Sequence, residues 1–380
     1  MLEFLKNLTA DSKGKQLDFT FLFTLILLLG IGLLALSSAS SYYALTEYDN
    51  SSYYLIRQLL FAIVGVVVMI IVSKIDYKAY KNMSYIIFLI ALGLMLLVFV
   101  PGLGMTVKGA RRWLNLGLFT FQPSEIMKLG LILAISKYIV DNQKKMASLK
   151  GYIIPVLATI VVCVLMYFQS HLSGAIVMCF ITFVIILASG FKVKTRTLVL
   201  VLVVGLALVA AFLFSEEYRL ERVKAFLNPE TDVTGSNWQP TQSLYAIGSG
   251  GLFGRGLGQS RQKYLWLPEA QNDFVFSVYA EEFGFIGSLV VVGLFTFLVV
   301  RGVTIGLKSN DLYGMLITVG IIGMFAFQII VNIAVVTKLM PTTGMPLPFF
   351  SYGGTSLVIN LAAMGIVLGV SRQTSSKKDR

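Results

Sequence analysis

Long runs of apolar residues, broken by short polar or charged segments, follow one another along almost the whole chain. A helix that crosses a bilayer needs about 20 mostly apolar residues. By this criterion the pattern predicts ten membrane-spanning helices. They are expected at residues 18–38, 55–73, 84–101, 122–140, 152–169, 172–190, 197–214, 274–300, 313–337 and 355–371. The fifth and sixth are separated only by residues 169–171, but together they run to about twice the length of one crossing, so we count them as two.

The composition supports this interpretation. Hydrophobic residues make up 56% of the 380 residues and charged residues only 13%, whereas soluble domains carry roughly 25% charged residues. A soluble fold could not cover so much apolar surface with polar groups. The composition therefore excludes an ordinary soluble enzyme, a disordered protein and a disulfide-stabilised scaffold. We expect an all-α polytopic membrane protein in which residues 1–380 form a single integral membrane domain.

The net charge of +12 is compatible with binding to nucleic acid or to anionic lipid. The positions of the charges favour lipid. If the N-terminus is cytoplasmic, 18 Lys and Arg residues lie in cytoplasmic segments and 5 in the short outer loops. Such an excess on one side is typical of the cytoplasmic face of membrane proteins. We therefore expect both termini in the cytoplasm, membrane lipid around the protein, and no nucleic acid as a partner.

One predicted outer loop is much longer than the others. It covers residues 215–273, between the seventh and eighth helices, and loops of this length are usually functional or disordered. It begins with a charged amphipathic segment at 215–223 and contains a glycine-rich stretch at 248–258. Because this loop contains both apolar and polar residues, we expect it to fold against the membrane domain on the outer side.

Ionisable residues in or beside membrane spans are costly and are functional candidates by default. Arg111 precedes the fourth span, where it could anchor the chain at the lipid headgroups or bind an anion. Glu125 and Lys128 are three residues apart, so they share a helix face and can pair. A structural ion pair and a phosphate-binding lysine both remain open for them.

Acidic residues mark the start of the eighth span. Asp273 stands where the long loop meets this helix and could be its N-cap, and Glu281 and Glu282 follow further along it. Three carboxylates near one outer mouth suggest a proton acceptor or a site for a divalent cation that includes Asp273. Mg²⁺ or Mn²⁺ would be the ion, and no organic cofactor is expected.

Two other features concern the backbone and the lone histidine. Residues 340–356 are rich in Pro and Gly, which predicts non-helical backbone at membrane depth. Such backbone is tolerated only where it is buried in protein or lines a cavity. His171 stands on the short turn between the fifth and sixth helices, and we expect it to be exposed or hydrogen-bonded rather than a ligand.

Several of these segments together resemble the SEDS family (shape, elongation, division and sporulation proteins), the family of RodA, FtsW and SpoVE. The match covers nearly the whole chain. The segments that carry it are Gly109–Trp113, Gln122–Glu125 with Lys128, Leu267–Ala270 through Asp273 and Phe274, Ala280–Gly284, and Pro341–Gly344 through Gly353 and Gly354.

The resemblance implies a peptidoglycan glycosyltransferase that polymerises lipid II on the outer face of the bacterial cytoplasmic membrane. It also implies a cognate class B penicillin-binding protein as partner. The family's essential aspartate matches Asp273, its polar pair in the fourth helix matches Glu125 and Lys128, and its outer arginine matches Arg111. The chain departs from the family where His171 replaces an acidic residue, and no role is assigned to that position.

Two other functional classes remain as alternatives. A lipid II flippase would also need polar groups within its spans, but the chain has no inverted repeat of the transporter kind, and its acidic residues gather at one face. A structural scaffold of a cell-wall complex would tolerate loss of Asp273. For the enzyme, we expect Asp273 to act as general base or to position a cation, while Arg111 and Lys128 hold the pyrophosphate and Glu125 orients Lys128.

Overall fold

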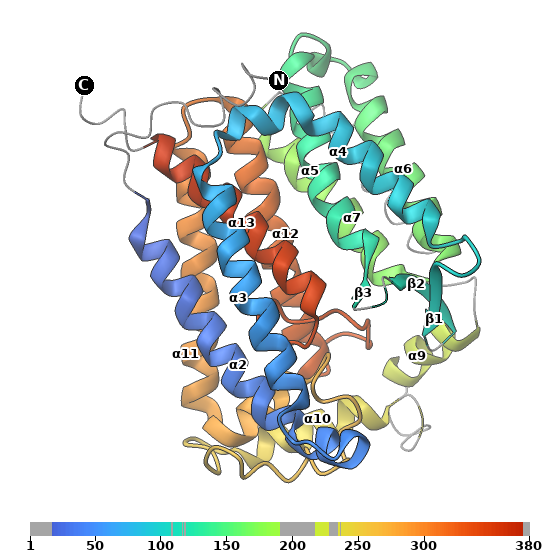
Figure 1. Ribbon diagram of the computed structural model, residues 1–380, viewed down its shortest axis with the longest axis vertical. Helices are drawn as coiled ribbons and strands as arrows, with labels where there is room; N and C mark the ends of the chain where they lie inside the picture. Colours follow the sequence, from blue (N-terminus) through green and yellow to red (C-terminus); the bar gives the residue numbers. More distant parts are fainter. Residues whose placement is uncertain are drawn as a thin grey trace.

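The computed structural model describes residues 17–107, 109–115, 117, 119–190, 217–227, 235 and 237–374, which are mostly helical (Figure 1). The helices are α2 (Phe19–Tyr48), α3 (Tyr53–Lys74), α4 (Tyr77–Leu97), α5 (Pro123–Asp141), α6 (Ile153–Phe168), α7 (Leu172–Ala188), α9 (Glu217–Leu227), α10 (Trp238–Ser249), α11 (Val275–Leu307), α12 (Leu312–Val336) and α13 (Gly354–Thr374). Two short 3₁₀ helices, η1 (Lys145–Ala147) and η2 (Leu149–Tyr152), precede α6.

Seven helical segments of the described chain are long and apolar enough to cross a membrane. They are α2, α3, α4, the segment Lys150–Phe168 that contains α6, α11, α12 and α13. The chain is therefore a multi-pass membrane protein, as its hydrophobic pattern predicts.

The three other expected spans differ from these seven. The span at 122–140 is the helix α5, but its four ionisable residues make it too polar to count as a lipid-facing span, and most of its side chains are buried in protein. The span at 172–190 is α7, an apolar helix of 17 residues. The span at 197–214 lies outside the described residues.

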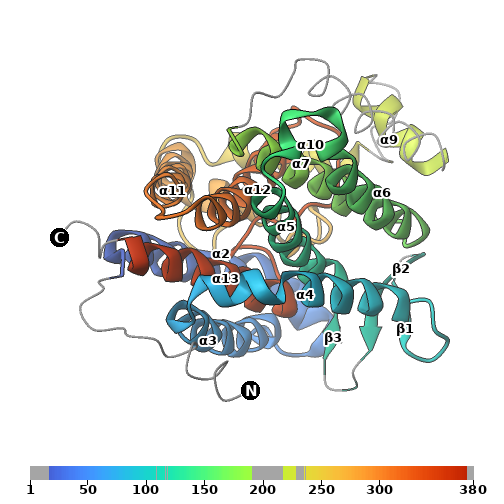
Figure 2. The same ribbon diagram turned by 90° about the horizontal axis from the view of Figure 1, so that it is seen from above.

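The spanning helices form two groups. Figure 2 shows α2, α3, α11 and α13 on one side and α4, α5, α6 and α7 on the other, with α12 between them in contact with α5, α7 and α11. Helices α9 and α10 and the non-helical segment 250–274 lie at one end of the bundle, at the bottom of Figure 1. We call this end the loop end.

The long segment between the predicted seventh and eighth spans contains two helices among its described residues. The amphipathic segment expected at 215–223 lies mostly in α9. Helix α10 packs against the membrane domain, because the Ser243 hydroxyl contacts the Ser277 hydroxyl at 2.7 Å and donates to the carbonyl of Val336 at 2.6 Å. The expectation that this segment folds against the spans is confirmed for α10.

A three-stranded antiparallel sheet between α4 and α5 was not expected. It consists of β1 (Gly104–Val107), β2 (Ala110–Asn115) and β3 (Thr120–Phe121), in that order. In the β1–β2 register, Thr106 is opposite Arg111. Neighbouring residues of a strand face opposite sides of a sheet, so β2 directs its two arginines to different surroundings.

Residues 337–353, between α12 and α13, contain no helix. The Pro and Gly pattern predicts this for residues 340–356, and it is confirmed up to residue 353, because α13 begins at Gly354. In the second half of this segment the apolar side chains of Met345, Leu347, Phe349 and Phe350 are buried, at 0–3% exposure, whereas Leu339 near its start is exposed. Polar side chains of the spans satisfy their backbone: Gln58 donates to the Ser351 carbonyl at 3.2 Å, and Asn332 donates to the Met345 carbonyl at 2.8 Å. The segment is thus irregular backbone held inside the protein, the condition that a membrane imposes on it.

Helix α11 is interrupted at Gly284, which adopts φ 70° and ψ −166°. The interruption frees backbone groups on either side of this residue, and the glycine-rich stretch after α10 pairs with them. Four backbone hydrogen bonds result: Arg255 to Glu281 at 3.0 Å, Gly256 to Glu282 at 3.0 Å, Phe285 to Gly251 at 2.9 Å and Ile286 to Leu252 at 3.1 Å.

Candidate functional site

The described residues enclose a small polar cavity between α5, α7 and the irregular segment 337–353. Its volume of about 30 Å³ is room for about two water molecules. The polar residues that line it are Ser124, Glu125, Lys128, His171, Ser173 and Gln328, and Gly344, Met345 and Pro346 close one side.

The ion pair at the start of α5 lines this cavity. Glu125 and Lys128 are 7% and 5% exposed, and the Nζ–Oε2 distance is 2.8 Å. Pro123 occupies the first turn of α5, where it needs no backbone donor. Both side chains also line a second, smaller cavity of about 10 Å³, which is bounded by Asn360 of α13. The predicted pairing of Glu125 and Lys128 is confirmed.

Asp273 lies just before α11, next to the wall of the polar cavity. The N-cap of α11 is Phe274 and not Asp273, so the N-cap interpretation of Asp273 is wrong. The Asp273 carbonyl accepts a hydrogen bond from Asn332 at 2.8 Å. Its half-buried carboxylate faces Gly344, since a Cβ added there would lie 3.6 Å from Oδ2. Gly344, in turn, lines the cavity that holds Glu125 and Lys128.

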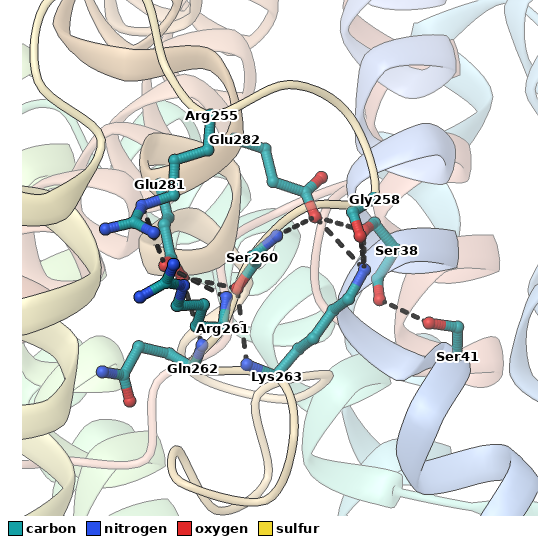
Figure 3. A network of polar contacts seen from close by, with 10 residues as sticks. All are labelled: Ser38, Ser41, Arg255, Gly258, Ser260, Arg261, Gln262, Lys263, Glu281 and Glu282. Atoms are coloured by element: carbon teal, nitrogen blue, oxygen red, sulfur yellow. Dashed lines mark hydrogen bonds and ion pairs between the residues drawn. The ribbon is translucent and has the colours of Figure 1, made fainter.

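Glu281 and Glu282 belong to a different polar network, at the interruption of α11 (Figure 3). Glu282 is 2% exposed; its Oε1 accepts a hydrogen bond from Ser38 of α2 at 2.5 Å and pairs with Lys263 Nζ at 3.4 Å. These contacts hold the segment that follows α10 against α2 and α11.

The carboxylate of Glu281 binds the same segment, mainly at the backbone amides of that segment. Its carboxylate accepts from the Ser260 hydroxyl at 2.5 Å, from the amide of Arg261 at 3.1 Å and from the amide of Gln262 at 3.3 Å. In the described part of the chain, no three His, Cys, Asp or Glu side chains gather closely enough to hold a metal ion. The structure therefore does not bring Glu281 and Glu282 together with Asp273 in one acidic cluster.

The two arginines of β2 divide as the strand geometry requires. Arg111 donates to the carbonyl of Val100, beyond the end of α4, at 3.1 Å, and it does not line the polar cavity. Arg112 donates to the carbonyls of Gln169 at 3.4 Å and of Ser170, in the turn between α6 and α7. Arg112, which the sequence interpretation did not select, is thus the arginine that lies beside the cavity. Neighbouring side chains of a strand face opposite sides of a sheet, so a strand predicted at this place would have separated Arg111 from Arg112.

His171 is partly exposed to the cavity but surrounded by protein. Its ring packs on Gly174, where an added Cβ would lie 2.7 Å from Cε1 and 2.8 Å from Nδ1. Burial, together with the positive charges of Arg112 and Lys128, lowers the pKa of His171 to about 3. The ring is therefore neutral at physiological pH.

Two polar atoms at this cavity have no hydrogen-bond partner among the described residues. They are Nδ1 of His171 and the hydroxyl of Ser124, which is 3% exposed. The expectation that the lone histidine is exposed or hydrogen-bonded is wrong for Nδ1. No sequence signal indicates such an atom, because its lack of a partner depends on how three distant segments pack.

Comparison with known proteins places this chain among cell cycle proteins. The family model FTSW_RODA_SPOVE, described as "Cell cycle protein", matches residues 19–376. Stage V sporulation protein E of Bacillus subtilis is 42% identical over 362 residues, which cover 95% of this chain and 98% of that protein. A probable peptidoglycan glycosyltransferase FtsW of Trichlorobacter lovleyi is 39% identical over 98% of this chain and 96% of its own length.

Comparison with solved structures agrees with the comparison of sequences. A chain of a structure described as the structural coordination of polymerization and crosslinking by a peptidoglycan synthase complex superposes with a TM-score of 0.77 at 30% identity, over 94% of this chain and 98% of that one. The rod shape determining protein RodA of Thermus thermophilus superposes with a TM-score of 0.68 at 30% identity, over 94% and 97% of the two chains.

Proposed function

This chain belongs to the FtsW, RodA and SpoVE family of cell cycle proteins, and from that membership we propose how it works as a peptidoglycan glycosyltransferase. The reaction that we propose is the polymerisation of undecaprenyl-linked lipid II into glycan strands. The observation that carries this assignment to a site is the half-buried carboxylate of Asp273 beside a cavity that holds a buried lysine.

We place the loop end of the bundle on the outer face of the cytoplasmic membrane and both termini in the cytoplasm. The support is the distribution of positive charge. The connections at the opposite end of the bundle, between α3 and α4, α5 and α6, and α11 and α12, contain or adjoin Lys74, Lys78, Lys144, Lys145, Lys150 and Lys308. An excess of Lys and Arg in short loops marks the cytoplasmic side.

In the proposed reaction, the 4-hydroxyl of an acceptor sugar attacks C1 of the sugar that lipid II carries on its pyrophosphate. The new C1–O bond forms as the bond from C1 to the pyrophosphate breaks, and the hydroxyl proton passes to the carboxylate of Asp273. A carboxylate within hydrogen-bond reach of the proton can supply this general-base step.

Lys128 is the cation that we assign to the leaving pyrophosphate, because its ammonium group borders the cavity next to Gly344. Glu125 fixes the position of that ammonium group. We give Arg111 the role of holding β2 against the end of α4, so it supports the site without contact to the cavity. Since the cavity has room for about two waters, only the reacting hydroxyl and its neighbours fit there unless residues 344–346 move.

A divalent cation, Mg²⁺ or Mn²⁺, stays a prediction. The residues around Asp273 do not offer a good site for it, because Glu125 is paired with Lys128 and no other carboxylate of the described residues lines the cavity. No step of the proposed mechanism passes through a metal.

We also propose that a cognate class B penicillin-binding protein works with this chain and crosslinks the glycan. The support is the likeness to a chain of a structure described as a peptidoglycan synthase complex. Since such a partner would act on the product of this chain, we expect it to approach from the loop end.

The test is polymerisation of labelled lipid II by the purified chain in liposomes, with and without the partner. We expect the wild type to make glycan polymer and Asp273→Asn to make none. Asp49→Asn is a matched control, because Asp49 is exposed and has φ 51° at the end of α2, a conformation that Asn tolerates. Normal polymerisation by Asp273→Asn would refute the role of Asp273. Transfer of lipid II across the bilayer without any new glycosidic bond would instead identify a flippase.

A further inference from the structure

The two unpartnered polar atoms at the cavity call for a ligand. Polar atoms that are buried without hydrogen bonds are rare and costly, and each one needs an explanation. Thirteen side-chain atoms of the described residues are in this condition, and only those of Ser124 and His171 belong to residues that line the larger cavity. The two residues come from different elements, α5 and the turn before α7, and both line the same cavity.

The position of the His171 ring is set by its surroundings. The turn before it is tight, because Ser170 has φ 53° and the amide of His171 donates to the carbonyl of Met166 at 2.8 Å. The absence of a side chain at Gly174 leaves room for the ring to lie against the backbone of α7. The guanidinium group of Arg112 holds the turn by its bond to the Ser170 carbonyl. The ring is therefore held in place before any ligand arrives.

The charges around the ring decide which group it can bind. Arg112 and Lys128 are the cations that act on it, and Glu125 is already paired with Lys128. Because the two cations disfavour a second proton on the ring, one nitrogen is an acceptor and the other an N–H donor, and we assign Nδ1 as the acceptor and Nε2 as the protonated nitrogen. An acceptor at this position repels the oxygens of a phosphate but receives a hydrogen bond from a hydroxyl group.

We propose that His171 and Ser124 form a subsite for a sugar hydroxyl, which donates to His171 Nδ1 and accepts from the hydroxyl of Ser124. This proposal rests on the proposed function and adds the acceptor sugar as the group bound there. A hydroxyl is both donor and acceptor, and so it satisfies both atoms at once. Gly344 borders the same cavity and faces the Asp273 carboxylate, so a sugar held there is beside the proposed base.

The test compares substitutions that differ only in whether an acceptor remains. In His171→Asn, the side-chain carbonyl stands close to the position of Nδ1, whereas His171→Leu fills similar space without an acceptor. We expect His171→Leu to raise the KM for lipid II about tenfold, the effect of one lost hydrogen bond together with an unpaired partner. We expect His171→Asn to stay within about twofold of the wild type.

Ser124→Ala provides the second arm, and Thr296→Ala, at an exposed position of α11, is its control. We expect Ser124→Ala to raise KM about threefold to tenfold, with a combined effect in Ser124→Ala/His171→Leu that is smaller than the product of the two, because one hydroxyl contacts both residues. Thermal unfolding of each variant separates loss of binding from loss of structure.

Three outcomes are decisive. A KM for His171→Leu equal to that of the wild type would overturn the subsite and would mean that the two atoms bind only water. Equal defects in His171→Asn and His171→Leu, with lowered thermal stability in both, would also overturn it, since the ring would then be structural. Absence of polymer from the wild type would refute the proposed function itself, a result distinct from either of these.

Discussion

The buried ion pair between Glu125 and Lys128 allows a prediction that separates stability from activity. At the observed 2.8 Å, the Coulomb attraction is about 6 kcal/mol for an effective dielectric constant of about 20. Desolvation of both charges offsets much of this attraction. Removal of one partner is a different matter, because it leaves a charge at 5–7% exposure without compensation, at a cost of about 3–5 kcal/mol.

We therefore expect Lys128→Met to lower the free energy of unfolding by about 4 kcal/mol and the melting temperature by roughly 5 °C, if the chain unfolds as one unit. The double variant Glu125→Leu/Lys128→Met should regain most of that stability, because apolar residues of similar volume replace a buried pair at little cost. Neither variant should polymerise lipid II, because both lack the proposed contact to the pyrophosphate.

The assay is thermal unfolding in detergent together with polymerisation in liposomes, on the same protein preparations. If the double variant is no more stable than Lys128→Met, the pair is not the source of the loss. If Lys128→Met melts with the wild type and polymerises normally, the assigned role of Lys128 is refuted.

Three further predictions concern the surroundings of the cavity. Gly174→Ala should raise the KM for lipid II about as much as His171→Leu does, roughly tenfold, because the added methyl group displaces the ring; a KM equal to that of the wild type would show that the ring position is unimportant. Because the pKa of His171 is about 3 in the folded protein against 6.5 ordinarily, the unfolded chain binds the extra proton between these values, so stability should fall as the pH is lowered from about 6.5 toward 3. The melting temperature of the wild type should therefore fall relative to that of His171→Asn as the pH is lowered over that range, and parallel curves would contradict the shift. Arg112→Gln should reduce polymerisation more than Arg111→Gln does, since only Arg112 holds the turn beside the cavity, and the reverse order in initial rates would contradict this assignment.

Seven of the ten expected spans and the Glu125–Lys128 pair could be predicted from sequence, because both depend on local spacing. An apolar run of about 20 residues indicates a crossing wherever it occurs, and residues three apart on a helix meet. The lack of helix in residues 337–353 could also be predicted from local sequence, because Pro and Gly within the segment disfavour regular helix. For the same reason, the position of Asp273 just before α11 was foreseen, although its side chain faces Gly344 instead of capping the helix.

What could not be predicted depends on contacts between distant segments. The strands of the sheet are two to six residues long and of mixed polarity, so their pattern is too short to stand out. Glu281 and Glu282 are satisfied by partners about 20 residues earlier in the chain and, at Ser38, by another helix. Which arginine of β2 reaches the turn before α7 follows only once the strand and its register are known.

The interruption of α11 has a consequence for chimeric proteins built between this chain and its relatives. Residues 251–256 and 281–286 exchange four backbone hydrogen bonds, so they form one structural unit although a further 24 residues separate them in the sequence. A graft that replaces only the loop would leave donors and acceptors of the helix unpaired close to the membrane, at a cost of several kcal/mol for each group. Exchangeable blocks must therefore extend from the glycine-rich stretch to beyond Gly284. A loss of activity in a chimera with a shorter graft would then result from damage to α11 and not from the loss of a partner protein.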